Sequence, residues 1–179
     1  MLAPPIRNAL TIDVEDYFQV SAFAPYIRRD DWDRRECRVE ANMDRILSLL
    51  AAQDVRATFF TLGWVAERYP QVVRRIVEGG HELASHGYGH ERASDLSPEA
   101  FSQDVERAKA LLEDIAGVPV LGYRAPSFSI GLKNLWAFDK LARAGYRYSS
   151  SIYPIKHDHY GMTDSPRFAY GVGDGLLEI

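Results

Sequence analysis

The stretch His81-Glu82-Leu83-Ala84-Ser85-His86-Gly87-Tyr88-Gly89-His90 organises the rest of the chain. It holds three of the five histidines, and His86 and His90 stand four residues apart. Two imidazole rings at that spacing can share one metal ion, because side chains four apart on a helical turn are about 6 Å from each other. Gly87 and Gly89 disfavour a regular helix, so a loop after a strand at residues 81–85 fits better. A pair of surface histidines is the alternative, and a metal site requires an anionic ligand as well.

Three carboxylates follow the first predicted strand, at residues 9–12. Asp13, Glu15 and Asp16 would repel one another in a dry site without a cation. In extended chain, residues two apart face the same side, so Asp13 and Glu15 would point together while Val14 packs behind them. An acidic loop in solvent is the alternative reading of this cluster.

Strands and helices alternate along the sequence. Buried strands are predicted at residues 9–12, 56–61, 81–85, 118–123, 146–152 and 175–179, and helices at 40–52, 70–78, 97–117 and 133–144. This alternation predicts an α/β fold with parallel strands, and active sites in such folds gather at the carboxyl ends of the strands. Residues 13–16, 86–90 and 124–128 all follow predicted strands, which favours one joint site. Residues 17–38 are predicted to be an irregular excursion over that end of the sheet.

Composition indicates one globular domain over residues 1–179. The chain is 46% hydrophobic and 26% charged, with a net charge of −4 and no long run of like charges, so a nucleic-acid partner is not expected. Its one cysteine, Cys37, excludes an internal disulfide and a multi-cysteine zinc site. The absence of an 18-residue apolar stretch predicts no membrane span, and the absence of a signal-peptide pattern at the start predicts a cytoplasmic protein. The sequence gives no indication of the oligomeric state.

A carboxylate and two histidines form a ligand set typical of catalytic zinc, which keeps one position open for water. The metal lowers the pKa of that water to about 7 and polarises a carbonyl oxygen, so hydrolysis of an amide or ester is the expected chemistry. A second carboxylate beside the first can accept the proton of the water. The cluster at residues 13–16 and the histidine pair together therefore predict a metal-dependent hydrolase.

Four motifs in order resemble the polysaccharide deacetylases, also called NodB-homology carbohydrate esterases. They are Thr11-Ile12-Asp13, Ala57-Thr58-Phe59-Phe60, Ser85-His86 with His90, and Arg124-Ala125-Pro126 with Phe128. The resemblance spans most of residues 8 to 152. The sequences of residues 13–18 and 124–129 look most like those of a subgroup linked to bacterial exopolysaccharide loci with exosortase systems.

The resemblance implies a distorted (β/α) barrel that removes N-acetyl groups from N-acetylhexosamine units of an exopolysaccharide. Asp13 would be the general base, oriented by Arg124. A divalent metal, with zinc as the first candidate and cobalt, nickel or manganese as alternatives, would be bound by His86 and His90 together with Glu15 or Asp16. Strand alternation favours Glu15. The residues expected to border the substrate groove are Tyr88, Pro126 and Phe128.

The sequence departs from the family pattern in three places. Val14 replaces the second Asp of the family's Asp-Asp, which is why the metal carboxylate must be Glu15 or Asp16. Ser149 stands where the family often has an acidic partner for the arginine. The family's C-terminal Leu-x-His, which supplies the general acid, is absent, so we expect a fragment with an unfinished barrel. His157 is then a candidate general acid, with an ordinary loop histidine as the alternative.

Two other functions remain open at this point. The same site could hydrolyse peptidoglycan or a small cyclic amide instead of an exopolysaccharide. The chain could also be a glycan-binding relic with weak or no turnover, because Ser149 and the missing acid motif would weaken catalysis. If the chain acts on an exopolysaccharide or on peptidoglycan, or binds a glycan without turnover, its partner is an acetylated glycan.

Overall fold

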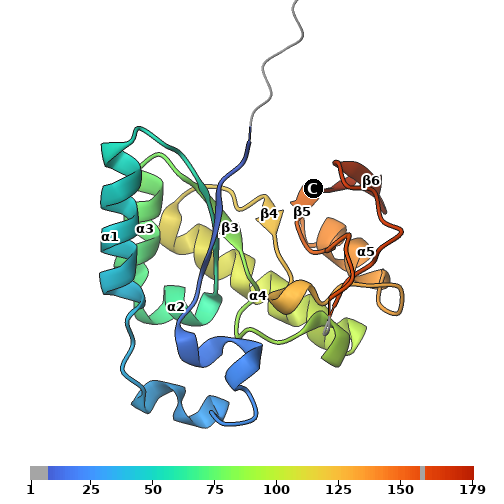
Figure 1. The fold of residues 1–179 in the computed structure, drawn as a ribbon, viewed down its shortest axis with the longest axis horizontal. Coiled ribbons are helices and arrows are strands. Elements are labelled where there is room, and N and C mark those ends of the chain that lie inside the picture. The colour runs from blue at the N-terminus through green and yellow to red at the C-terminus, as the bar shows by residue number, and fades with distance from the viewer. Residues whose placement is uncertain (1–7, 158–159) are drawn as a thin grey trace, which may run out of the picture.

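A single sheet of seven strands forms the centre of the computed structural model, which describes residues 8–157 and 160–179. The strands are β1 (Thr11–Val14), β2 (Thr58–Thr61), β3 (Glu82–Ser85), β4 (Gly122–Tyr123), β5 (Tyr148–Ser149), β6 (Tyr170–Val172) and β7 (Leu176–Glu178). Their order in the sheet is β1-β2-β3-β4-β5-β7-β6, and all neighbours are parallel except the β6/β7 pair. Within the described residues the sheet is therefore open, with β1 and β6 at its two edges (Figure 1).

In the described part of the chain, five α-helices pack around this sheet. They are α1 (Val39–Ala52), α2 (Gly63–Arg68), α3 (Pro70–Glu78), α4 (Pro98–Ala116) and α5 (Trp136–Arg143). Figure 1 shows α1 and α3 side by side at one end of the molecule, with α5 and β6 at the other. Among the described residues, no helix has the length and apolarity needed to cross a bilayer.

Local sequence signals explain where α4 begins and ends. The Ser97 hydroxyl accepts a hydrogen bond from the Ala100 amide at 3.2 Å, as an N-cap does, and Pro98 occupies the first turn. At the other end Gly117 has a φ of 66°, a left-handed conformation that glycine adopts without strain. Both ends agree with the prediction from sequence.

The segment at residues 17–38 is ordered by aromatic packing. It forms three short 3₁₀ helices at Tyr17–Gln19, Ser21–Phe23 and Arg29–Arg34. Phe18, Trp32 and Trp64 meet with ring centroids 5.7 to 5.9 Å apart and are almost fully buried. This cluster fixes the segment beside the carboxyl end of β1, where it supplies part of a cavity wall.

The α/β class and the parallel arrangement are confirmed, and every predicted helix and strand is present in some form. The strands predicted at residues 118–123 and 146–152 are shorter in the structure. They correspond to β4 and β5, which have two residues each. Helix α2 and strand β6 were not predicted. The register places Asp13 beside Phe60, and Thr61 beside Ser85, so the ends of β1, β2 and β3 lie level.

Candidate metal centre

Three stretches that are far apart in sequence meet at the carboxyl end of the sheet. Asp13 and Glu15 come from the end of β1, His86 and His90 from the loop after β3, and Arg124 from the residue after β4. A cavity of about 420 Å³ opens there. Its lining among the described residues is Asp13, Glu15, Val20, Ser21, Ala22, His86, His90, Arg92, Ser127, Phe128 and Tyr160.

Glu15 and the two histidines point their polar atoms at one another. Nε2 of His90 lies 2.9 Å from Oε2 of Glu15, and Nε2 of His86 lies 3.9 Å from the same oxygen. One ligand atom from each of the three residues falls within 4.8 Å of the other two. The histidines are buried and the Glu15 side chain is 18% exposed, so the group sits at the floor of the cavity.

Two observations show that this group fits a divalent cation. Oε2 of Glu15 is buried and has no hydrogen-bond partner among residues 8–157 and 160–179, so its contact with His90 is close without the geometry of a hydrogen bond. Nδ1 of His86 lies 2.8 Å from the carbonyl oxygen of Arg124, which can only accept, so Nδ1 carries the proton and the lone pair of Nε2 faces the group. Burial also lowers the pKa of His86, which favours the neutral imidazole that binds metals. An unpaired buried carboxylate oxygen beside neutral imidazole nitrogens is the donor set of a zinc site.

Asp16 does not belong to this group, so the structure corrects its inclusion among the candidate metal ligands. Its Oδ1 accepts a hydrogen bond from the amide of Tyr17 at 2.8 Å, and its Oδ2 accepts one from the amide of Val39 at 2.9 Å. The carboxylate therefore caps the first 3₁₀ helix and ties it to the start of α1. Strand alternation accounts for the difference, because Glu15 faces the same side as Asp13 while Val14 is buried in the core.

Asp13 is held beside the metal group by Arg124. Nη1 of Arg124 donates to Oδ1 of Asp13 at 2.7 Å, while Nη2 donates to the hydroxyls of Thr11 and Ser150 at 3.0 and 3.1 Å. The other oxygen, Oδ2, lies 3.9 Å from Nε2 of His86. Asp13 thus has one oxygen fixed by the guanidinium and one that faces the cavity, as a general base requires.

The histidine loop has an anchor that the sequence reading missed. The Asp104 carboxylate, on α4, accepts the amide of Tyr88 at 3.1 and 3.2 Å, and burial raises the pKa of Asp104 to about 6. Gly87 has a φ of 74°, and a β-carbon at Gly87 would come within 2.8 Å of Asp104. His90 also has a positive φ, of 56°. The loop backbone is therefore bent to bring both imidazoles to one point. Asp104 is an acidic residue on the inward face of the amphipathic helix α4. That position was the feature of the sequence that could have identified it.

Of the three residues expected to border the groove, the structure places only Phe128 on the described cavity wall. The Tyr88 hydroxyl donates to Glu67 at 2.6 Å and Arg107 stacks on its ring, so Tyr88 faces α2 and α4 instead. Pro126 is buried and is not among the described lining residues. His157 stacks on Tyr160, with ring centroids 4.1 Å apart, and is not among the described lining residues either. The structure thus places Tyr88 and Pro126 away from the described cavity wall, and the role of His157 as a general acid stays a prediction.

A buried carboxylate does occur near Ser149, but it comes from the next strand in the sheet. Glu178, on β7, is 1% exposed, and its Oε1 accepts the amides of Ser151 and Ile152, each at 2.6 Å. Burial raises the pKa of Glu178, with the Ser149 hydroxyl and the Arg124 charge acting in the opposite direction. The segment that anchors Arg124 is therefore fixed by an anion that the sequence reading did not identify.

Comparisons with known proteins agree with this geometry. The model of the polysaccharide deacetylase family matches residues 26–149. A peptidoglycan deacetylase of Helicobacter pylori is 27% identical over 128 residues, which is 69% of this chain and 41% of that protein. A peptidoglycan-N-acetylglucosamine deacetylase of Bacillus cereus is 32% identical over 82 residues, which is 46% of this chain and 30% of that protein.

The fold agrees as well. A crystal structure of a Mycobacterium smegmatis protein that carries the same family name superposes with a TM-score of 0.73 at 29% identity, over 95% of this chain and 56% of that one. The chain thus spans less than half the length of the two curated relatives and about half of this structure.

Proposed function

This chain belongs to the polysaccharide deacetylase family, and we propose that it is a metal-dependent N-deacetylase acting on N-acetylhexosamine units of a bacterial exopolysaccharide. The observation that carries the proposal is the convergence of Glu15, His86 and His90 on one point, with the free oxygen of Asp13 beside it. A metal site with an adjacent base is the arrangement that amide hydrolysis needs.

Glu15, His86 and His90 would hold a divalent ion, with zinc as our first candidate. When bound, such an ion activates a water molecule and polarises the acetyl carbonyl. The charges are consistent with this assignment. The point is surrounded by two imidazoles, which bind metals in their neutral form, by the carboxylates of Glu15 and Asp13, and by the guanidinium of Arg124. A dipositive ion would leave the group with a net charge of +1, since the two carboxylates offset two of the three positive charges.

Asp13 would act on protons at its Oδ2 atom. That oxygen faces the cavity, while Oδ1 stays on Arg124, so Oδ2 can accept a proton from water as the carbon–oxygen bond forms. Breaking the carbon–nitrogen bond requires a proton on the leaving amine. Asp13 then holds the proton just accepted and is placed to return it, which yields acetate and an amino sugar. This assignment does not require His157.

Peptidoglycan is the second candidate substrate, because both curated relatives are named for it. Acetate release separates the two substrates and also tests the activity itself. The protein would be stripped with a chelator, reloaded with one equivalent of zinc, and incubated with an acetylated exopolysaccharide and with peptidoglycan strands, while ring opening of a small cyclic amide is followed in parallel. We expect the zinc-loaded protein, and not the stripped protein, to release acetate from the exopolysaccharide. Acetate from peptidoglycan alone would make peptidoglycan the substrate, ring opening alone would indicate a cyclic amidase, and a metal-loaded protein with neither activity would indicate a glycan-binding relic.

A further inference from the structure

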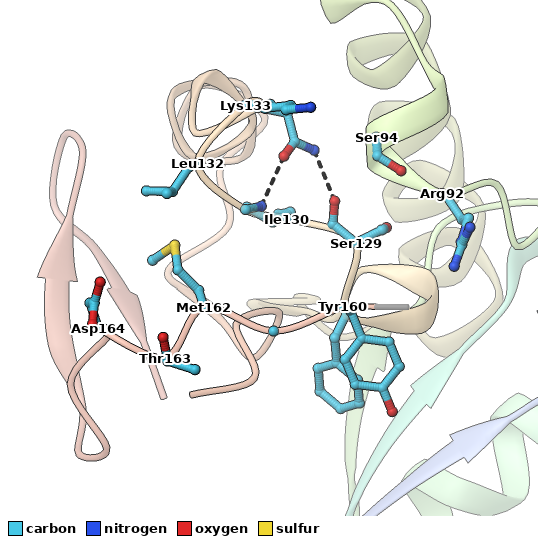
Figure 2. Close-up of a pocket in the computed structure, with 14 residues that line it drawn as sticks. Arg92, Ser94, Ser129, Ile130, Leu132, Lys133, Tyr160, Met162, Thr163 and Asp164 are labelled. Carbon is cyan, nitrogen blue, oxygen red and sulfur yellow. Dashed lines mark hydrogen bonds between the residues drawn. The ribbon is translucent and has the colours of Figure 1, made fainter. Parts of the chain in front are cut away.

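A second cavity adjoins the one at the metal group. It measures about 490 Å³ and is lined by the loop of residues 128–134, by residues 160–164 and by Arg92 and Ser94. Arg92, Phe128 and Tyr160 line both cavities, so the two are neighbours across these side chains. Figure 2 shows Arg92 and Ser94 on one wall and Met162, Thr163 and Asp164 on the opposite one. A chain of sugars bound at the metal group would extend into this space.

The wall of the second cavity is rigid and suited to a sugar. The Asn134 side chain accepts the amide of Gly131 at 2.8 Å and donates to the carbonyl of Ser129 at 2.9 Å, which are the dashed lines in Figure 2. Asn134 is 6% exposed, so these bonds fix the loop from within. Aromatic rings and hydroxyl groups also line the space, at Phe128, Tyr160, Ser94 and Thr163. Such a mixture of apolar faces and a few polar groups is typical of small-ligand sites.

Arg92 lies at the junction of the two cavities and has no anionic partner among the described residues. Its neighbour Glu91 is paired with Arg29 at 2.7 Å, and Arg124 is committed to Asp13. The Nε atom of Arg92 is buried and has no hydrogen-bond acceptor within the described part of the chain. A buried donor without a partner is costly, so an acceptor supplied by a ligand would be bound favourably. Because Arg92 stands between the two cavities, that acceptor belongs to the sugar beside the one at the metal group.

We propose that Arg92 binds a carboxylate on the sugar next to the N-acetylhexosamine, so that the preferred substrate is an anionic glycan. A guanidinium matches a carboxylate in a two-pronged, charge-assisted contact. Lys133, on the same cavity, adds a second positive charge, and among the described lining residues Asp164 supplies the one carboxylate. A uronic acid in an exopolysaccharide and the lactyl ether of muramic acid in peptidoglycan both supply such a group. The inference rests on the proposed deacetylase function and narrows its substrate class.

A matched pair of oligosaccharides tests the inference. The first is the hyaluronan tetrasaccharide, which alternates N-acetylglucosamine with glucuronate, and the second is the same molecule with each glucuronate reduced to glucose. Binding would be measured by calorimetry on zinc-loaded Asp13→Asn protein, so that no substrate is consumed, and acetate release on the wild type. Peptidoglycan strands with free or methyl-esterified lactyl groups would be compared in the same way, to show whether muramic acid can supply the carboxylate.

We expect the carboxylated tetrasaccharide to bind at least tenfold more tightly than the reduced one, as a charged hydrogen bond implies. Adding Arg92→Gln should bring the ratio close to one. Arg45→Gln, which removes the same charge from an exposed position on α1, should leave the ratio unchanged. Equal binding of the two tetrasaccharides, or a preference that persists in Arg92→Gln, would overturn the inference. A preference in binding without any acetate release would support this site and count against the deacetylase function, so the two failures are distinct.

Discussion

Nη1 of Arg124 lies 2.7 Å from Oδ1 of Asp13, in a contact that joins residues 111 positions apart in the sequence. The same carboxylate presents Oδ2 to the cavity, 3.9 Å from Nε2 of His86. The arginine therefore leaves only one of the two Asp13 oxygens available for proton transfer. This separates the base from the metal ligands, because Glu15 contacts both histidines and has no bond to Arg124 among the described contacts.

Asp13→Asn should abolish turnover while it spares metal binding. The amide cannot accept the proton of a water molecule, so acetate release should fall by about 10²- to 10⁴-fold. Zinc affinity by calorimetry should change little, because Glu15, His86 and His90 remain in place. Loss of zinc binding in Asp13→Asn would show that the base and the ligand have been exchanged.

Glu15→Gln and Asp16→Asn should have opposite effects. Glu15→Gln removes the anionic ligand, and we expect zinc affinity to fall by more than tenfold with little change in folding stability. Asp16→Asn weakens the cap that joins three backbone amides, so it should lower the unfolding free energy by about 1 kcal/mol and leave zinc binding intact. Calorimetry and urea denaturation of both variants measure the two properties. If Asp16→Asn is the variant that loses zinc, the ligand assignment is wrong.

Arg124→Lys should lower kcat much more than it raises KM. An ammonium group cannot reach Asp13, Thr11 and Ser150 together as the guanidinium does. Loss of a charged hydrogen bond worth roughly 1.5–3 kcal/mol corresponds to a decrease of about 10- to 100-fold. Arg143→Lys, at an exposed site on α5, is the matched control. Steady-state kinetics that show a change in KM alone would assign Arg124 to substrate binding instead.

Asp104 should make the stability of the protein depend on pH. Burial raises its pKa from 3.8 to about 6. Between these pH values the folded chain binds more protons than the unfolded chain, so the unfolding free energy falls as the pH rises from 3.8 to about 6. At 1.36 kcal/mol per pH unit between the two pKa values, the stability of Asp104→Asn relative to wild type should rise by roughly 2 kcal/mol from pH 4 to pH 7. Urea denaturation at several pH values measures this difference. Parallel curves for the two proteins would contradict it, and Asp114→Asn, on the exposed side of α4, controls for charge.

Glu178→Ala should destabilise the segment that anchors Arg124. The change leaves the buried amides of Ser151 and Ile152 without an acceptor, at about 1–3 kcal/mol each, and opens a small cavity. We expect the unfolding free energy to fall by about 2–5 kcal/mol in urea denaturation. Leu177→Ala, at a neighbouring side chain that is 49% exposed, should cost much less. A loss of the same size in both variants would show that the strand, and not the carboxylate, is responsible.

The sequence predicted the elements whose signals are local. Helix α4 has its cap, its proline and its terminal glycine in the expected places. The choice between Glu15 and Asp16 also followed from alternation along a strand, because Val14 is buried in the core. Helix α2 and strand β6 were missed, since α2 is six residues long and β6 has only three. Segments this short do not show a clear hydrophobic period.

Residues that act from another strand or helix were the harder part of the site. Asp104 and Glu178 hold the backbone of the site through bonds to residues 16 or more positions away, and such contacts leave no local pattern. The family resemblance implied that Tyr88 borders the groove, but the left-handed Gly87 turns it toward Glu67. Backbone direction in a tight loop depends on tertiary anchors such as Asp104, which a sequence pattern does not specify.

The location of a bound ion tests the central claim most directly. Crystals soaked with zinc would be measured above and below the zinc absorption edge. We predict one anomalous peak between Oε2 of Glu15 and the Nε2 atoms of His86 and His90, at about 2.0–2.2 Å from each. A zinc ion bound at Asp16 or His157 instead, or no peak beside the two histidines, would contradict the account.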